Sequence, residues 1–181
     1  MSLHRVYLIT GIIALAISLI AYAVKKKSQI LGLRMITDTI WIVNYFCKGS
    51  FAFTGAVNAA VCLMRDSVFF FRTKEKRWAS HIAWFVVFCL FYATTHAYTW
   101  AGYKSLIPGV SSIISTSALY SSNLRFTRWM TILAMAVNGV YLILVGNMFN
   151  LAANVCSIIS AIIGLVRDAR DRKKNAAPES A

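Results

Sequence analysis

The stretch VNAAVCLMRD, residues 57–66, lies in an apolar segment suited to lipid, yet it carries one amide and two adjacent opposite charges. An ionisable group inside a bilayer costs about 2.5–3.5 kcal/mol even on insertion scales, so such a residue usually faces protein or water. The segment therefore predicts a membrane helix with one face turned inward. Asn58, Arg65 and Asp66 are the residues on it that need an explanation.

The rest of the chain has the composition of a membrane protein. Of its 181 residues, 59% are hydrophobic, and the mean hydropathy is +0.63, which is more apolar surface than a soluble core of this size covers. The net charge of +13 comes from short clusters of Lys and Arg between apolar runs, a pattern that argues against a nucleic-acid partner. Four cysteines without CxxC spacing and three scattered histidines predict no metal site, cofactor or disulfide framework.

Seven segments are long enough, or nearly so, to cross a hydrocarbon layer of about 30 Å. They cover residues 6–24, 30–47, 51–71, 78–100, 105–122, 127–146 and 148–166. The fifth begins near Pro108 and is rich in Ser and Thr, whose hydroxyls can bond back to their own helix. The expected fold class is all-α, a polytopic membrane protein with seven transmembrane helices.

Basic residues between these segments predict the orientation, because Lys and Arg collect in cytoplasmic loops. If the N-terminus is outside, fifteen basic residues fall in the inside connections and tail, and only three fall outside. Arg34 and Arg128 are counted among the fifteen. We expect an N-out/C-in topology, with residues 175–181 as a disordered cytoplasmic tail.

Two stretches in different halves of the chain are similar to each other. RMITDTIWIVN (34–44) and RWMTILAMAVN (128–138) share Arg, Thr, Val and Asn in register. In the same way, Gly11 and Tyr22 of the first segment are matched at equal spacing by residues 109 and 120 of the fifth. Such matches indicate an internal duplication, which is common in membrane transport folds.

The duplication predicts one transmembrane domain over residues 1–174. Repeat one covers 6–72, a linker helix covers 78–100, and repeat two covers 105–167. The odd linker helix gives both repeats the same direction, so the arrangement is a 3+1+3 parallel repeat.

Three stretches resemble a known family: LIPGVSSIISTSALYSSNLRFTRWM (106–130), VGNMFNLAANVCSIISAIIGLVR (145–167) and GAVNAAVCLMRDSVFFFR (55–72). They are similar to the bacterial inner-membrane family typified by YgjV, over most of residues 6–170. That family is placed with the PQ-loop superfamily, which includes the SWEET sugar transporters. The resemblance implies a multi-pass protein of the bacterial inner (plasma) membrane, a SWEET-like arrangement and a transport role.

Amides on the third and seventh segments are the first candidates for a solute site. In the sugar transporters an asparagine on each of these two helices faces the pocket, and Asn58 and Asn154 are similar by position. Trp41, Asn138 and Asn150 lie on polar faces of their segments and are further candidates. These side chains could bind the hydroxyls or carbonyls of a small polar solute, or they could only hold helices together.

Arg65 lies toward the cytoplasmic end of its segment, beside Asp66 and at a depth similar to that of Asp38. A pair of Arg65 with Asp38 would neutralise two charges that cannot easily reach water. The pair could act as an inner gate or an anion site, or it could be a permanent structural contact. Alternatively, Arg65 could extend to the lipid headgroups.

The function expected from these features is a transporter or facilitator that passes a small polar solute through a central, amide-lined cavity. The alternative is a non-transporting membrane protein, a receptor or an assembly factor, whose polar residues are structural. No P-loop, HExxH, GxSxG or paired-carboxylate motif is present, so enzyme activity is not expected. The expected partners are the lipid bilayer and the solute, and a homo-oligomer is compatible with the sequence.

Overall fold

The computed structural model of the chain describes residues 3–48, 53–98, 106–145 and 148–176, and all regular structure within these ranges is helical. The prediction of seven helices is confirmed, and a short 3-10 helix at Arg77–Ser80 follows the third. In chain order the α-helices are α1 Leu3–Ala21, α2 Lys27–Lys48, α3 Phe53–Thr73, α4 Ala83–Tyr98, α5 Leu106–Tyr120, α6 Leu124–Val145 and α7 Met148–Ala176.

Local sequence accounts for how these helices keep their polar groups satisfied. Asn123 stands just before α6, and its Oδ1 accepts hydrogen bonds from the backbone N–H groups of Arg125 (3.0 Å) and Phe126 (3.2 Å), as a helix N-cap does. Within the apolar helices, hydroxyls bond back one turn: Ser67 donates to the carbonyl of Leu63 at 2.7 Å. Polar residues therefore occur in the helices without leaving the backbone or the hydroxyl unpaired.

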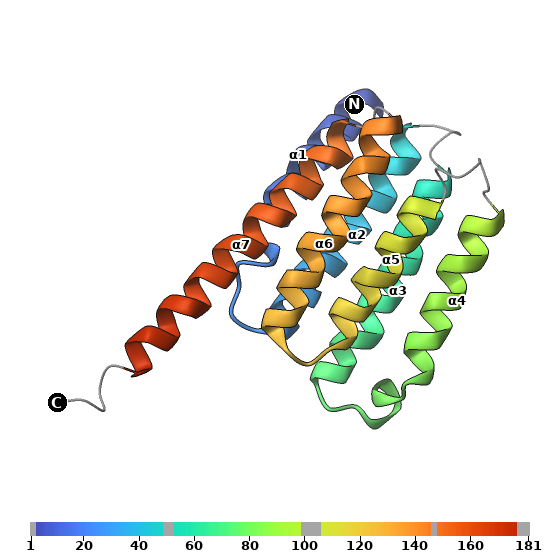
Figure 1. The fold of residues 1–181 in the computed structure, drawn as a ribbon. Helices are drawn as coiled ribbons and strands as arrows, with labels where there is room; N and C mark the ends of the chain where they lie inside the picture. The colour runs from blue at the N-terminus through green and yellow to red at the C-terminus, as the bar shows by residue number, and fades with distance from the viewer. Residues whose placement is uncertain (1–2, 49–52, 99–105, 146–147, 177–181) are drawn as a thin grey trace.

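The helices form two layers with one helix at the edge (Figure 1). In one layer α1 packs against α2 and α2 against α3, and in the other α5 packs against α6 and α6 against α7. The layers are joined at their ends, because α1 contacts α7 and α3 contacts α5. The edge helix, α4, packs on α5 and α3. The last turns of α7 extend beyond the bundle in Figure 1.

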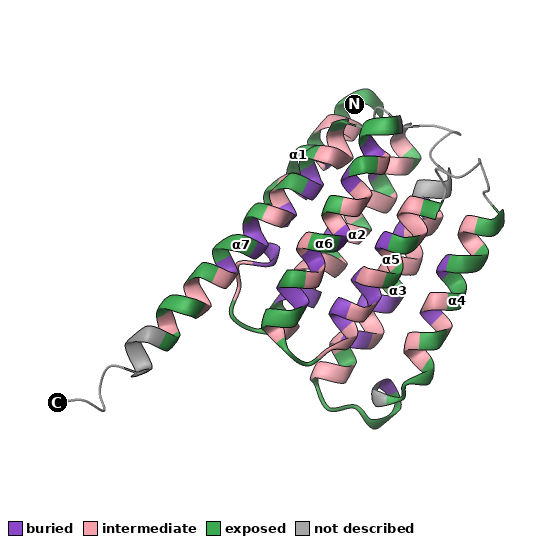
Figure 2. Cartoon of the chain, in the orientation of Figure 1, coloured by how far each residue is buried: buried purple, intermediate pink, exposed green. Residues whose placement is uncertain are grey.

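The outer surface of the bundle is unlike that of a soluble protein. Large apolar residues are exposed on the outer faces of the bundle; examples are Ile12 (61%), Leu90 (59%) and Ile143 (60%). Figure 2 shows such exposed positions on every helix of the bundle. The buried set is rich in Ser, Thr, Asn and Arg, so the bundle is built to meet lipid outside and to pair polar groups inside.

Three of the described helices are long and apolar enough to cross a membrane by themselves: α1, residues Leu124–Leu144 of α6, and residues Met148–Arg172 of α7. α4 and α5 are apolar but shorter within the described residues. α2 and α3 contain buried charges, including Arg34, Arg65 and Asp66, which lowers their mean hydropathy. The predicted topology of seven spans with the N-terminus outside stays a prediction.

Two arginines that were expected in loops lie within helices. Arg34 lies within α2 with its side chain only 13% exposed, and Arg128 lies within α6 with its side chain fully buried. Both were expected to be loop charges because they stand near the ends of apolar segments. Of the expected tail, residues 177–181 lie outside the described residues, and α7 continues to Ala176.

Candidate functional site

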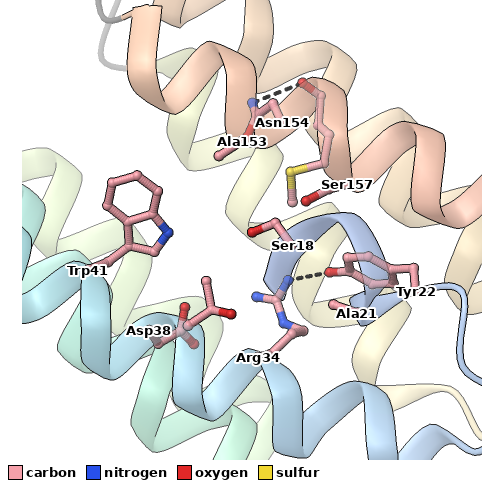
Figure 3. Close-up of a pocket in the computed structure, with 11 residues that line it drawn as sticks. Ser18, Ala21, Tyr22, Arg34, Asp38, Trp41, Ala153, Asn154 and Ser157 are labelled. Carbon is pink, nitrogen blue, oxygen red and sulfur yellow. Dashed lines mark hydrogen bonds between the residues drawn. The ribbon is translucent and has the colours of Figure 1, made fainter. Parts of the chain in front are cut away.

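A polar cavity of about 140 Å³ lies between the two layers (Figure 3). Its walls come from α1 and the residue that follows it, from α2, and from α6 and α7. The lining residues are Ser18, Ala21, Tyr22, Arg34, Thr37, Asp38, Trp41, Met135, Ala153, Asn154 and Ser157. Both layers therefore contribute to one cavity, and most of its lining side chains are polar or charged.

Three of the predicted site residues line this cavity: Asn154, Trp41 and Asp38. Asn154 comes from α7, and its Nδ2 donates to the carbonyl of Met135 on α6 at 3.2 Å. Trp41 and Asp38 both come from α2, and Figure 3 shows them on a different wall from Asn154. The structure thus brings together an amide, an indole and a carboxyl group from two layers.

The other predicted amides lie elsewhere. Asn150, one turn before Asn154 on α7, donates to the hydroxyl of Tyr45 at 2.7 Å, and Asn138 is half-buried on α6. Asn58 is half-buried on α3, is not among the cavity-lining residues, and has a buried Oδ1 without a hydrogen-bond donor. Asn154 therefore shares the cavity with residues of α2 and not with Asn58.

A buried charge cluster lies next to the cavity and is centred on Asp66. The two carboxylate oxygens of Asp66 accept hydrogen bonds from Nε of Arg65 at 2.8 Å and from Nε of Arg34 at 2.6 Å. Asp66 is fully buried and the Arg65 side chain is 1% exposed, so Arg65 does not extend to the headgroups. The prediction that Arg65 pairs with Asp38 is wrong, because the described ion pairs join both Arg34 and Arg65 to Asp66.

The physical reason for this pairing is the packing of α2 on α3. Asp66 follows Arg65 directly on α3, and the packing of α2 on α3 brings Arg34, one turn before Asp38, to the second oxygen of the same carboxylate. Nη1 of Arg65 also donates to the Thr116 hydroxyl on α5 at 3.4 Å, and the guanidinium carbon of Arg65 lies 5.6 Å from the centre of the Tyr92 ring on α4. One carboxylate and two guanidinium groups thereby tie four helices together.

A third arginine, Arg128, is not among the site residues predicted from the sequence. Its guanidinium donates to the backbone carbonyls of Tyr22 (3.1 Å), Val24 (2.8 Å) and Gly164 (3.1 Å), and it also pairs with Asp168. It therefore joins the C-terminal end of α1 to α6 and α7. We call these contacts the Arg128 clasp. Arginine is suited to this position because its planar group donates several hydrogen bonds in fixed directions.

A related contact caps the C-terminal end of α5. Arg72 on α3 donates to the backbone carbonyl of Tyr120, and its guanidinium carbon lies 3.7 Å from the centre of the Tyr120 ring. In both places the last carbonyls of one helix accept a hydrogen bond from an arginine of the other layer. In the sequence, the internal repeat points to the two tyrosines and to Arg128, since Tyr22 matches Tyr120 and Arg34 matches Arg128.

The cavity lies between two sets of contacts along the helix axes. At one end stand the bond from Arg34 to the Tyr22 hydroxyl and the Arg128 clasp. At the other end stand the Asn150–Tyr45 bond and an edge-on contact of the Tyr7 and Phe149 rings, whose centres are 5.7 Å apart. Protein groups thus bound the cavity at both ends.

The chemistry available in the cavity is recognition of a polar ligand. Hydroxyls of Ser18 and Ser157, the Asn154 amide, the Asp38 carboxyl and the Arg34 guanidinium supply both donors and acceptors. Among the described residues no group of three or more His, Cys, Asp or Glu side chains could hold a metal ion. Polar groups of this kind, set within a lipid-facing bundle, are expensive to bury and typically mark a working site.

Comparison with known proteins supports the membrane location. The family Imp-YgjV, described as bacterial inner membrane protein, matches residues 7–172, which is most of the chain. Neither the curated proteins nor the solved structures compared with the chain gave a match. The apolar outer surface of the helices is in keeping with this assignment. The chain therefore belongs to the Imp-YgjV family of bacterial inner membrane proteins.

Proposed function

We propose that this protein is a transporter or facilitator of a small polar solute, which binds in the cavity between the two layers. The cavity wall supports the proposal: α1 and α2 of one layer and α7 of the other contribute polar side chains to it, and α6 contributes Met135. A site shared by two halves can be opened on one side and closed on the other by a small movement of one half against the other.

The packing pattern supports a repeat of this kind. Exchanging α1, α2 and α3 for α5, α6 and α7 leaves the main helix contacts unchanged, because α1·α2 becomes α5·α6, α2·α3 becomes α6·α7, and α1·α7 becomes α5·α3. We infer a 3+1+3 parallel arrangement with α4 as the linker, N-out/C-in. This is the arrangement of the SWEET transporters, and transport by analogy with them rests on fold alone.

A second candidate function has a specific observation in its favour. Buried polar groups also join helices away from the cavity: Asn44 on α2 donates to the Tyr7 carbonyl (2.7 Å) and the Thr10 hydroxyl (2.8 Å) of α1, and Ser111 on α5 donates to the Ala134 carbonyl (2.8 Å) on α6. Such bonds hold membrane helices together without any transport. A receptor or assembly factor built on the same bundle would use Asn154 in this way as well.

Uptake into liposomes separates the two functions. Liposomes containing the purified protein are incubated with a mixture of amino acids, sugars, polyols and small carboxylates, and the solutes retained inside are identified by mass spectrometry. We expect one chemical class to accumulate above protein-free liposomes. Replacing Asn154 by Ala should lower that uptake about two- to tenfold, since it removes an amide worth about 0.5–1.5 kcal/mol from the cavity wall.

The matched control is Asn44→Ala, which removes a buried amide that does not line the cavity. It should lower the melting temperature but leave uptake per folded protein unchanged. If no solute accumulates, or if both variants lower uptake only in proportion to their loss of stability, the polar residues are structural and the second function is favoured.

A further inference from the structure

Two opposite charges of the cavity wall stand one helical turn apart and do not pair with each other. Arg34 and Asp38 are at positions i and i+4 of α2, a spacing at which such side chains ordinarily meet. Here Arg34 forms its ion pair with Asp66 of α3 instead, and among the described residues Asp38 belongs to no ion pair. The separation of the two charges is therefore imposed by the buried cluster behind the cavity.

The Arg34 guanidinium is held in place with one nitrogen left for a ligand. Its Nε donates to Asp66 at 2.6 Å, and Nη1 donates to the Tyr22 hydroxyl. Figure 3 shows the remaining terminal nitrogen of Arg34 pointing into the cavity. A guanidinium fixed in this way is a directional donor to a carboxylate, and its orientation costs little when the ligand binds.

Asp38 supplies the opposite charge. Its Oδ2 is buried and accepts no hydrogen bond from the residues that the structure describes, which is a costly state for a carboxylate inside a membrane protein. Arg34 and Arg65 act on Asp38 only from beyond ion-pair distance, so an ammonium group in the cavity would supply a direct partner. Trp41 stands three residues further along α2 and also lines the cavity, and the face of an indole ring attracts cations.

We propose that the solute is a small zwitterion, whose carboxylate binds Arg34 and whose ammonium group binds Asp38. This inference rests on the proposed function and names its substrate class. The cavity of about 140 Å³ is close in size to one that admits benzene, so a solute of about six non-hydrogen atoms fits in it. An α-amino acid of the size of alanine or serine meets both requirements of charge and size.

Four solutes with the same three-carbon skeleton and similar size separate the charge requirements: L-alanine is a zwitterion, L-lactate an anion, 2-amino-1,3-propanediol a cation and glycerol neutral. Each is added to the purified full-length protein in detergent, and the melting temperature is measured over a range of concentrations. We expect L-alanine to raise the melting temperature at lower concentration than the other three, because only it offers both a carboxylate to the remaining Arg34 nitrogen and an ammonium group to Asp38.

Two variants assign the effect to Asp38. Asp38→Asn keeps the shape of the side chain and removes its charge, and it should weaken L-alanine binding by about tenfold or more. Asp171→Asn makes the same change at the exposed carboxylate that pairs with Lys25, and it should leave L-alanine binding unchanged. An equal response of both variants, or an unchanged affinity in Asp38→Asn, would overturn the assignment.

The outcomes also separate this inference from the proposed function. If L-lactate, the aminodiol or glycerol stabilises the protein more than L-alanine, the zwitterion is wrong while a solute site remains. If none of the four stabilises it, the zwitterion is overturned, and the liposome uptake of other solute classes tests transport independently.

Discussion

Replacing Asp66 by Asn is expected to lower the free energy of unfolding by about 3–5 kcal/mol, since it removes the carboxylate with which both guanidinium groups form their ion pairs. Asparagine keeps the shape of the side chain, but it is neutral and replaces one acceptor oxygen by a donor that faces an arginine. Arg65, with its side chain 1% exposed, cannot turn to water to recover the loss. Equilibrium unfolding in mixed detergent micelles, followed by circular dichroism, measures the change.

The control for this prediction is Asp171→Asn, which removes the same charge from a pair whose side chains are 66% and 46% exposed. Exposed pairs contribute about 0–1 kcal/mol, so this variant should unfold almost as the parent does. A loss below about 1 kcal/mol in Asp66→Asn would contradict the pairing of both arginines with Asp66.

Replacing Gly164 by Ala should destabilise the protein by about 3 kcal/mol, because the Arg128 clasp leaves no room for a Cβ. An added Cβ would lie 2.5 Å from Nε of Arg128 and 2.6 Å from the backbone oxygen of Tyr22. The backbone oxygen cannot rotate away, so the guanidinium must leave at least part of its set of carbonyl acceptors. The melting temperature and the free energy of unfolding should both fall.

Gly139→Ala is the matched control, because a Cβ there meets only Cδ1 of Leu151 at 3.7 Å, an ordinary contact. Alanine is favoured over glycine in a helix by up to about 1 kcal/mol, so this variant should be as stable as the parent or more so. If Gly164→Ala behaves like Gly139→Ala, the clasp does not have the close packing described above.

Much of the fold could be predicted because membrane helices are encoded by long apolar segments that can be read one at a time. The charges in VNAAVCLMRD predict an inward-facing side of this helix, and Arg65 and Asp66 are buried there, although Arg65 pairs with Asp66 and not with Asp38. Asn154 was identified through its place in the second repeat, and it does line a polar cavity.

The partners of these residues could not be predicted, because they depend on which helix faces which. Arg34 is expected to be a loop charge, yet the packing of α2 on α3 brings its guanidinium group to the Asp66 carboxylate. Arg128 also stands near a helix end, and only the approach of α1 and α7 surrounds it with carbonyl oxygens. Asn58 was expected opposite Asn154 from their equivalent positions, but the cavity of Asn154 is completed by α2.

We expect water and solutes to reach the cavity between the polar faces of the two helix layers, while the outer faces meet lipid. Two single-cysteine variants test it, with the four native cysteines replaced by alanine. Ser157→Cys places the thiol on the cavity wall, and Ile159→Cys places it on the outer face of the same helix, where the parent residue is 43% exposed.

The measurement is the rate at which a small, charged thiosulfonate labels each variant in membranes, because this reagent reacts with the thiolate that forms in water. We expect faster labelling of Ser157→Cys than of Ile159→Cys. Faster labelling at Ile159→Cys, or equal rates at both positions, would contradict it.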